Sequence, residues 1–489
     1  MKRKKIIALF SGLVAILLIA EVNGQVTNSL YFMPGVPQSN RINPAIQPNC
    51  NFYLGFPLLA PLRLELSSSS LAYKDFIYPD YELDSLITFL HPNADREIFL
   101  DALKPLNFVA SDIGTSLASF GFRAGRNFIS VDATTRVDGN FYYPGDVFKL
   151  LLNGAMEDET YSFDGLGVDL SVFNEVSIGW SRNILSNLDI GARAKFLFGV
   201  ANVTTNRSDL RLTTSMDSWT IESDMLLSAS LPFAEVTYDE EGLIEEVDVK
   251  DEFDNPSPNL ISGYLFNTKN FGFAADLGVN FHPLDRLMLS ASVTDLGFIR
   301  WTDGIHSASY ELDAYEFKGI EVNPLSGTDD YSVGDMVDST LTAIGDSLMG
   351  LFVMQEGGAY GKRLNTKLYL GASYFVTPKI SFGLLSRTDF MNNKIAQQFT
   401  ASANLTTGRF INLSLTYSYI NNYFKNFGTG LSFNVGPFNM YLISDNILNL
   451  ALWPEETQSV NLWFGLNLTF GYRAYTKRAK EYKDKPMVY

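Results

Sequence analysis

The chain has 489 residues and a formal net charge of −17, with 46% hydrophobic residues, 19% charged residues and one cysteine, Cys50. This acidic balance excludes an ordinary nucleic-acid binder, because phosphate contacts need lysine and arginine. The single cysteine excludes an internal disulfide. The lack of any internal run of 18 apolar residues excludes an ordinary helical membrane protein.

Residues 1–24 are predicted to be a secretory signal peptide. Basic residues at 2–5 precede an apolar core at 6–20, and Val22 and Gly24 stand where cleavage requires small residues. Gln25 is therefore the expected start of the mature chain. The alternative is an uncleaved membrane anchor, which needs a longer apolar run.

Residues 25–66 are predicted to be a hatch, a segment that plugs a barrel. The stretch 33–45 is rich in proline and asparagine, which favours turns, and the apolar stretch 52–66 is interrupted by Pro57 and Pro61. Irregular backbone of this kind can lie in a barrel lumen, where its polar groups find partners. A loose periplasmic tail is the alternative.

Residues 67–110 are predicted to be helical. Leu83, Leu86, Ile87 and Leu90 follow helical spacing, which Pro92 ends. A second helix is expected after an Asp95 cap, with 98–103 carrying its apolar face. This helix pair is expected to pack against the barrel or to cover its mouth.

Residues 111–472 are predicted to form an all-β, transmembrane antiparallel β-barrel. In 411–419 and 460–472, apolar side chains alternate with small or polar ones, so each segment has one apolar and one polar face. These runs reach the roughly 10 residues that a tilted strand needs to cross a bilayer. An aromatic-rich soluble sandwich is the alternative.

About 14 strands are predicted, with 16 as the alternative. The predicted spans are 112–123, 127–138, 166–181, 187–201, 203–215, 219–231, 268–282, 286–300, 307–318, 366–376, 379–390, 396–407, 410–421, 426–435, 437–446 and 459–472. Of these, 203–215 and 219–231 are less apolar and are expected as a hairpin beyond the membrane.

The order of short and long connections predicts which turns face the periplasm, because short turns belong there. Turns at 377–378, 407–409 and 436–437 fit this rule, and the last strand then ends in the periplasm. The turn at 283–285 looks periplasmic, yet counting back from the C-terminus places it outside. Either a strand in 351–365 or a lumen segment within 319–365 would remove the conflict.

Three further segments lie outside the regular strands. Residues 236–260 are strongly acidic and are interpreted as a solvated loop, with Ca²⁺ binding as the alternative, although no spaced calcium-loop pattern is present. Residues 334–350 are predicted to be a helix. Residues 473–489 are a basic tail, expected in the periplasm.

Short motifs carry a resemblance to known barrels. The sequence Asn43-Pro44-Ala45 resembles the opening of FadL-like fatty-acid-transporter barrels, which implies a hatch inside fourteen strands. A wider frame, 40–45 with 436–438 and 444–446, is similar to Bacteroidetes outer-membrane barrels, some of which serve type IX secretion and gliding, while a sister family has no assigned function. The hatch motif that this resemblance implies consists of Asn40, Arg41, Asn43, Pro44 and Ala45.

The residues give no sign of enzymatic chemistry. The three histidines, His91, His282 and His306, have no spacing that pairs them with a nucleophile, and no Cys/His cluster indicates zinc. We therefore predict no catalytic residue, no metal and no cofactor.

Four charged residues are predicted to face the lumen. Asp189, Arg193, Lys195 and Asp276 lie opposite apolar rows, and lipid-facing charges would cost about 2–4 kcal/mol at mid-depth. They are expected either to pair with one another and with the hatch or to select a solute.

Two functions are compatible with these patterns. The first is FadL-like passage or binding of small hydrophobic molecules in a bacterial outer membrane, with membrane lipid and that ligand as partners. The second is an accessory barrel of a secretion machinery, which acts through contact with secretion-system proteins. An apolar pocket opening through the wall would favour the first function, and a lumen packed solid would favour the second.

Overall fold

The structure is a computed structural model that describes residues 28–471, apart from 60, 81–84, 92–93, 217, 239–243, 255, 318–352, 392–393, 408–409, 421–422 and 448–453. The predicted signal peptide, the predicted helix at 334–350 and the basic tail lie outside the described residues. No helix among the residues described is long and apolar enough to cross a membrane.

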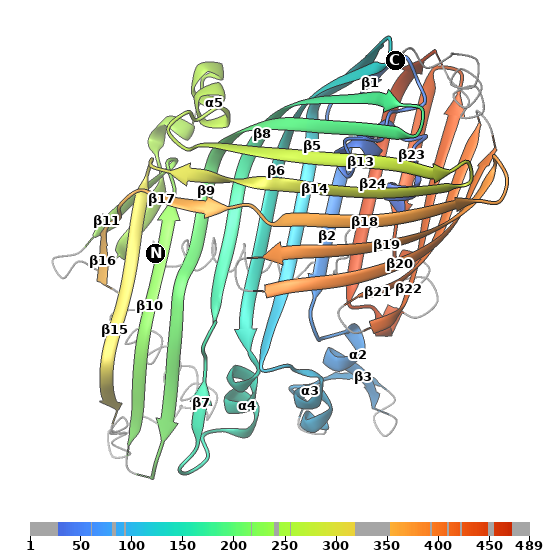
Figure 1. Ribbon diagram of the computed structural model, residues 1–489. Helices are drawn as coiled ribbons and strands as arrows, with labels where there is room; N and C mark the ends of the chain where they lie inside the picture. The colour runs from blue at the N-terminus through green and yellow to red at the C-terminus, as the bar shows by residue number, and fades with distance from the viewer. Residues whose placement is uncertain are drawn as a thin grey trace.

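The chain forms a closed, antiparallel β-barrel of 14 strands, as predicted (Figure 1). Its first strand consists of two pieces, β1 (Phe52–Gly55) and β2 (Leu62–Ser68). The others, in order round the wall, are β5 (Leu106–Ala124), β6 (Asn127–Pro144), β8 (Gly167–Leu185), β9 (Leu188–Thr214), β13 (Phe271–Leu284), β14 (Leu287–Trp301), β18 (Thr366–Phe375), β19 (Ile380–Met391), β20 (Lys394–Thr407), β21 (Ile411–Ile420), β22 (Tyr423–Val435), β23 (Phe438–Ser444) and β24 (Ser459–Phe470).

The strand β1/β2 closes the barrel, because it pairs with β24 on one side and with β5 on the other. The prediction that the hatch extends to residue 66 is therefore wrong. The segment 52–66 alternates like a wall strand: Phe52, Leu54 and Leu62 are exposed on the outer face, whereas Tyr53 and Glu65 are buried.

This closing strand is interrupted in its middle. Leu54 lies opposite Leu468, and Leu62 lies opposite Phe464, so eight residue steps of the closing strand span only four of β24. The surplus residues bulge outward, with Leu58 exposed and in a left-handed conformation (φ 62°). Pro57 and Pro61 have no N–H to offer a neighbouring strand, which explains why pairing stops here.

The predicted strand 307–318 is not part of the barrel wall. It corresponds to β15 (Ile305–Phe317), which pairs with β10 (Trp219–Ser230), and β10 pairs with the end of β9 from residue 202 to 214. Figure 1 shows these strands running down one side of the molecule. We call residues 202–214, β10 and β15 the extension; the small strands β7 (Thr160–Ser162) and β16 (Val353–Glu356) add to its edges.

This assignment removes the conflict about the turn at 283–285. The wall strands β14 and β18 are joined through β15, β16 and β17 (Tyr360–Arg363), none of which is a separate wall strand. Six short connections lie at one end of the barrel, which we call the turn end: 125–126, 186–187, 285–286, 376–379, 408–410 and 436–437. The opposite end, which we call the loop end, carries the long connections, together with two short ones between β19 and β20 and between β21 and β22.

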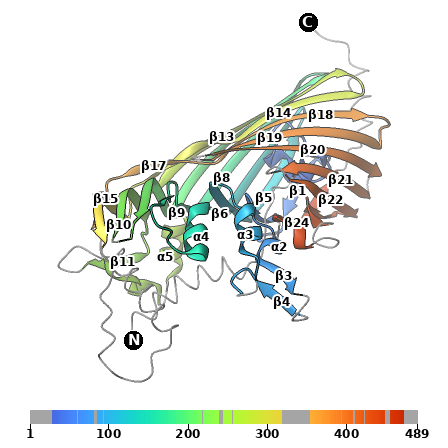
Figure 2. The same cartoon turned by 90° about the horizontal axis from the view of Figure 1, so that it is seen from below.

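Small elements cover part of the loop end (Figure 2). They are α2 (Tyr73–Phe76), the hairpin β3 (Ile77–Asp80) and β4 (Ser85–Thr88), α3 (Arg96–Ala102) and α4 (Gly145–Asn153). The remaining elements are β11 (Ala234–Tyr238), β12 (Ile244–Val249), η3 (Asp251–Phe253), α5 (Pro258–Leu265) and η4 (Pro454–Glu456).

One of the two predicted helices in 67–110 is wrong. Residues 85–88 form a strand, since Leu86 is 67% exposed and its neighbour Ile87 is 7% exposed, which is strand alternation. The second helix is confirmed as α3, where the Asp95 carboxylate accepts the Glu97 N–H at 3.1 Å.

The outer surface of the wall is apolar. Exposed leucine and phenylalanine side chains occur on nearly every wall strand, whereas the side facing the lumen is lined mainly by small, polar and charged residues, with two apolar clusters. A water-soluble protein rarely exposes so large an apolar surface. The arrangement is that of a barrel surrounded by lipid.

Candidate functional site

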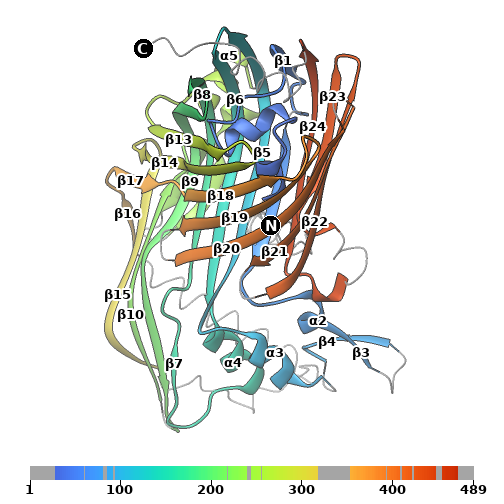
Figure 3. The ribbon, with the colours of Figure 1, turned by 45° about the vertical axis from the view of Figure 1, so that its right-hand side comes forward.

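Residues 28–51, which we call the hatch, lie inside the barrel (Figure 3). They contain two short 3-10 helices, η1 (Ser29–Phe32) and η2 (Pro37–Arg41), and are almost entirely buried. Apolar hatch side chains pack against inward-facing wall residues. This cluster comprises Leu30, Tyr31, Phe32, Met33, Val36 and Ile42 of the hatch with Tyr369, Leu385, Tyr441, Ile443 and Trp463 of the wall.

Hydrogen bonds fix the hatch to widely separated wall strands. The Asp445 carboxylate accepts the N–H groups of Asn28 and Ser29, the latter at 3.0 Å. The Tyr31 hydroxyl donates to Ser290 Oγ at 2.8 Å. Because the wall residues lie on different strands, they hold an irregular segment that has no regular backbone pairing of its own.

The predicted hatch motif lies where the hatch meets β6, β9 and β13. Arg41 Nη2 forms an ion pair with Asp132 at 2.7 Å, and Asn40 Oδ1 accepts a hydrogen bond from Arg193 Nη2 at 3.0 Å. The Asn43 side-chain amide donates to Asn280 Oδ1 at 2.9 Å.

Pro44 and Ala45 lie directly against the backbone of two wall glycines. A Cβ atom at Gly191 would lie 2.2 Å from the Pro44 carbonyl carbon, and one at Gly278 would lie 2.9 Å from the Ala45 nitrogen. Only glycine permits this close approach, so these positions of β9 and β13 are shaped to receive the hatch.

Three of the four predicted lumen charges belong to a buried network. Lys195 Nζ lies 2.8 Å from Asp276 and 2.6 Å from Asp295, and Arg193 lies 3.2 Å from Asp132. Asp189 is not part of it: this residue is half-buried near the turn end and accepts a hydrogen bond from Asn183.

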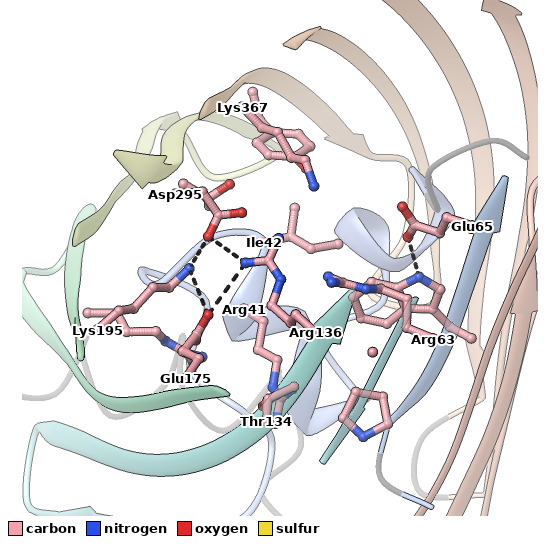
Figure 4. A pocket seen from close by; sticks show the side chains of 16 residues that line it. Arg41, Ile42, Arg63, Glu65, Thr134, Arg136, Glu175, Lys195, Asp295 and Lys367 are labelled. Atoms are coloured by element: carbon pink, nitrogen blue, oxygen red, sulfur yellow. Dashed lines mark hydrogen bonds and ion pairs between the residues drawn. The ribbon is translucent and has the colours of Figure 1, made fainter. Parts of the chain in front are cut away.

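The centre of the network is Arg136, which the sequence reasoning missed (Figure 4). Its guanidinium lies 2.9 Å from Asp295 and 3.4 Å from Glu175. It also lies 3.6 Å from Asp112. The polar face of β6 was the available signal, but only the closed barrel shows which strands face one another across the lumen.

Asp295 reaches this network through a β-bulge in β14. The pairing between β13 and β14 shifts register around it, and its φ is 59°, which is uncommon for a residue other than glycine. Its N–H donates to Asp276 Oδ1 at 2.8 Å. Strained backbone of this kind persists where the surrounding contacts fix it, and here it aims a carboxylate at Arg136 and Lys195.

Two small cavities lie in the lumen beside this network. The inner cavity, of about 50 Å³, is lined by residues such as Arg41, Arg136 and Lys195 (Figure 4). Pro61 also lines it. The outer cavity, of about 70 Å³, lies among loop-end residues of β2, β5, β6, β18, β19 and β20. Glu65 and Lys367 line both cavities and so mark the boundary between them.

Apolar side chains fill part of the lumen near these cavities. An apolar cluster of Phe173, Leu197, Ala274, Ile299, Trp301 and Leu364 packs inside the wall at β8, β9, β13 and β14. A larger hollow of about 520 Å³ lies across β18–β21 and is lined by exposed side chains such as Leu370, Leu384 and Phe399, so it belongs to the outer surface.

The arrangement offers ion pairing and polar recognition. Within the described residues no group of three or more His, Cys, Asp or Glu side chains is arranged to hold a metal ion, and part of the acidic loop, 239–243, lies outside them. His91, His282 and His306 lie in three separate places: the loop end, the end of β13 and β15.

One family model matches the sequence over residues 44–445, and its description is a family of unknown function (DUF5723). No curated protein matches the chain. Among solved structures, it is similar to the toluene transporter TbuX of Ralstonia pickettii, with 10% identity, a TM-score of 0.38 and coverage of 89% of this chain and 93% of that one.

Two other solved structures show a similar degree of likeness. A FadL homologue of Pseudomonas aeruginosa is 10% identical with a TM-score of 0.41, and the match covers 93% of this chain and 100% of that one. The toluene transporter TodX of P. putida is 9% identical with a TM-score of 0.38, and the match covers 88% of this chain and 93% of that one. Similarities of this size carry no argument about substrate or mechanism.

Proposed function

The chain belongs to a family of unknown function (DUF5723), and from its geometry we propose that it is a bacterial outer-membrane barrel through which small, partly hydrophobic molecules pass when the hatch moves. The observation that carries this proposal is the pair of cavities in the lumen. Pro61, which lies beside the interruption of the closing strand, is one of the residues that line the inner cavity.

The apolar outer surface of the wall supports the membrane assignment. Antiparallel barrels with short turns at one end and longer loops at the other are the form that spans outer membranes. By this rule the turn end faces the periplasm, and the hatch joins the wall there, because β1 starts at the turn end with Phe52 opposite Phe470.

The contacts of the hatch support a gating role. Its polar bonds to the wall are non-covalent, and the ion pair between Arg41 and Asp132 is its closest charged contact with the lumen network. Asp132 also contacts Arg193, so its charge stays compensated when Arg41 withdraws. Arg41 can therefore withdraw without leaving Asp132 as an unpaired charge.

The lining of the cavities indicates the class of molecule. The inner cavity is surrounded by charged side chains, whereas the outer cavity also has apolar walls from Leu66, Phe108 and Met391. A purely hydrocarbon molecule would have to displace buried ions, which is unfavourable. A molecule with both an apolar part and a charged group fits better.

A disulfide that fixes the hatch to the wall tests this proposal. Ser29 Oγ lies 2.7 Å from Thr416 Oγ1, so cysteines at these two positions are close enough to bond. The experiment uses S29C/T416C in a C50A background, reconstituted in liposomes, with solute entry followed by swelling. T160C/T213C is the matched control, because these hydroxyls lie 3.2 Å apart in the extension, away from the hatch.

We expect oxidation to stop solute entry through S29C/T416C and reduction to restore it, with no redox effect on T160C/T213C. Entry that is equal in the oxidised and reduced protein would refute the gate. Deletion of residues 28–50 should increase entry, and swelling no faster than in protein-free liposomes after this deletion would refute passage through the lumen.

The apolar clusters packed inside the barrel favour a second candidate, a barrel that acts through contact with secretion-system proteins. The extension also provides a protein surface beyond the wall, built from β10, β15 and residues 202–214. Crosslinking in native outer membranes tests this role. A covalent adduct that maps to the extension would support it, and the absence of any adduct would oppose it.

A further inference from the structure

The outer cavity contains two buried charged side chains with atoms that no described residue satisfies. Arg387 is 1% exposed, and its Nε donates to Asp389 Oδ1 at 2.6 Å, but its Nη1 and Nη2 have no partner among the residues described. Glu65 is 3% exposed; its Oε1 accepts the Trp463 indole N–H at 2.5 Å, while Oε2 has no such partner.

Unsatisfied charged groups are costly in a buried site, and native proteins satisfy nearly all of them. Arg387 is moreover held in place, since Asp389 fixes its Nε and its guanidinium lies over the Tyr369 ring, 5.4 Å from the centroid. The two free terminal nitrogens therefore present a fixed fork of N–H donors. Such a fork matches the two oxygens of a carboxylate.

We propose that the outer cavity binds a small zwitterion, a molecule that carries a carboxylate and an ammonium group on the same carbon atom. The carboxylate accepts hydrogen bonds from Arg387, and the ammonium donates to Glu65 Oε2. This inference deepens the proposed function and rests on it, because it names the class of molecule that enters the lumen.

The charges around the cavity favour a ligand with no net charge. Two cations, Lys367 and Arg387, line it together with four carboxylates, from Glu65, Asp112, Asp138 and Asp389. A simple anion would meet this excess of carboxylates, and a simple cation would leave Arg387 unsatisfied. A zwitterion satisfies both Arg387 and Glu65 and leaves the net charge of the site unchanged.

The size of the cavity restricts the ligand further. The outer cavity has a volume of about 70 Å³, so a compact molecule is required. Leu66, Phe108 and Met391 provide an apolar side for a small hydrocarbon group. The smallest amino acids have this size and this chemistry.

Three matched probes test the inference on the purified, full-length barrel in detergent. L-alanine carries both groups, propionate lacks the ammonium, and ethylammonium lacks the carboxylate. Binding is read from the shift in the thermal unfolding midpoint, because a ligand that binds the folded state raises it. We expect a saturable shift with alanine and, for the other two, binding at least about tenfold weaker, as each lacks one charged hydrogen bond.

Variants separate the two halves of the site. We expect R387Q and E65Q each to weaken alanine binding by about tenfold or more. A396L should abolish binding, because the larger side chain fills the cavity while both charged residues stay in place. This variant still tests the site if R387Q fails to fold. R207Q is the control, since Arg207 pairs with Asp224 in the exposed extension.

Two results would overturn the inference. The first is no alanine-dependent shift in the wild type, which would mean that water alone fills the cavity. The second is a shift that survives in A396L, or one that propionate or chloride reproduces at equal concentration. Alanine binding without alanine entry in the liposome assay would leave the site standing and reject the proposed passage.

Discussion

Arg41 provides the sharpest test of how the hatch is held, and we predict that R41Q loosens the hatch while leaving the barrel folded. Arg41 Nη2 donates to Asp132 Oδ1 at 2.7 Å, and its bonds to Ser116 and Thr134 are long, at 3.3 Å each. A hydrogen bond between charged groups contributes about 1.5–3 kcal/mol, and long neutral ones contribute less.

The loss is not larger because Asp132 does not become an uncompensated charge. It keeps Arg193 at 3.2 Å and the Ser119 hydroxyl at 2.7 Å. This excludes the cost of about 3–5 kcal/mol that follows when a buried ion loses every partner. We therefore expect the hatch to be destabilised by about 2–3 kcal/mol, which corresponds to about 30- to 150-fold faster exchange of its amides.

Hydrogen–deuterium exchange with mass spectrometry on the purified barrel measures this effect peptide by peptide. Peptides from residues 29–46 should lose protection in R41Q, whereas peptides from the wall strands should not change. R207Q removes an exposed arginine of the extension and serves as the control. Unchanged hatch exchange in R41Q, or an equal change in R207Q, would refute the assignment of Arg41 as an anchor.

Three other predictions follow from the contacts described above. G191A should push the hatch away from β9, because the added Cβ meets the Pro44 carbonyl carbon at 2.2 Å. We expect the hatch to be destabilised by about 1–3 kcal/mol, seen as faster amide hydrogen exchange in the hatch alone, and unchanged exchange would count against the contact. K195M should lower the urea midpoint, because it removes the closest cation of Asp276; we expect the free energy of unfolding to fall by about 3–5 kcal/mol. K149M, which breaks a partly exposed ion pair, should lower it by less than about 1 kcal/mol, and equal effects of the two substitutions would contradict the buried network. Burial raises the pKa of the Asp75 carboxyl in α2 above its usual value, so protonated Asp75 stabilises the folded state; this stabilisation is present below about pH 4 and is lost as the pH rises through the raised pKa. Hydrogen exchange around α2, corrected for intrinsic rates, should therefore become faster as the pH rises above about 4, and D75N should remove this trend. A flat wild-type profile would refute the prediction.

Strand alternation predicted most of the barrel, because each strand has one face in lipid and one in the lumen and so carries a local signal. The predicted total of 14 strands is confirmed, although two errors compensate for each other: the prediction counts 307–318 as a wall strand and 52–66 as part of the hatch. Proline residues at 57 and 61 hid the closing strand, since they interrupt its pairing at the bulge. Strand periodicity in 307–318 says nothing about whether lipid or water surrounds it.

The site was less accessible to sequence reasoning. Arg193, Lys195 and Asp276 could be placed in the lumen from alternation alone, because each lies opposite an apolar row. Their partners could not be predicted, since contacts across the lumen join strands that are distant in the chain. Arg387 is important because its Nη1 and Nη2 have no hydrogen-bond partner among the described residues, and no local sequence pattern could predict this.

The closing strand has a consequence for how the protein is assembled. Residues 52–68 are made early, yet their neighbour β24 is made some 400 residues later, so the seam between them cannot form until synthesis is nearly complete. Pairing over such a separation is slow, and until it forms the closing strand and β24 present unpaired backbone that attracts other chains. Loss of residues 52–68 would leave a split cylinder with open edges at β5 and β24, and a chaperone that shields unpaired edges would be needed most in the last moments before closure.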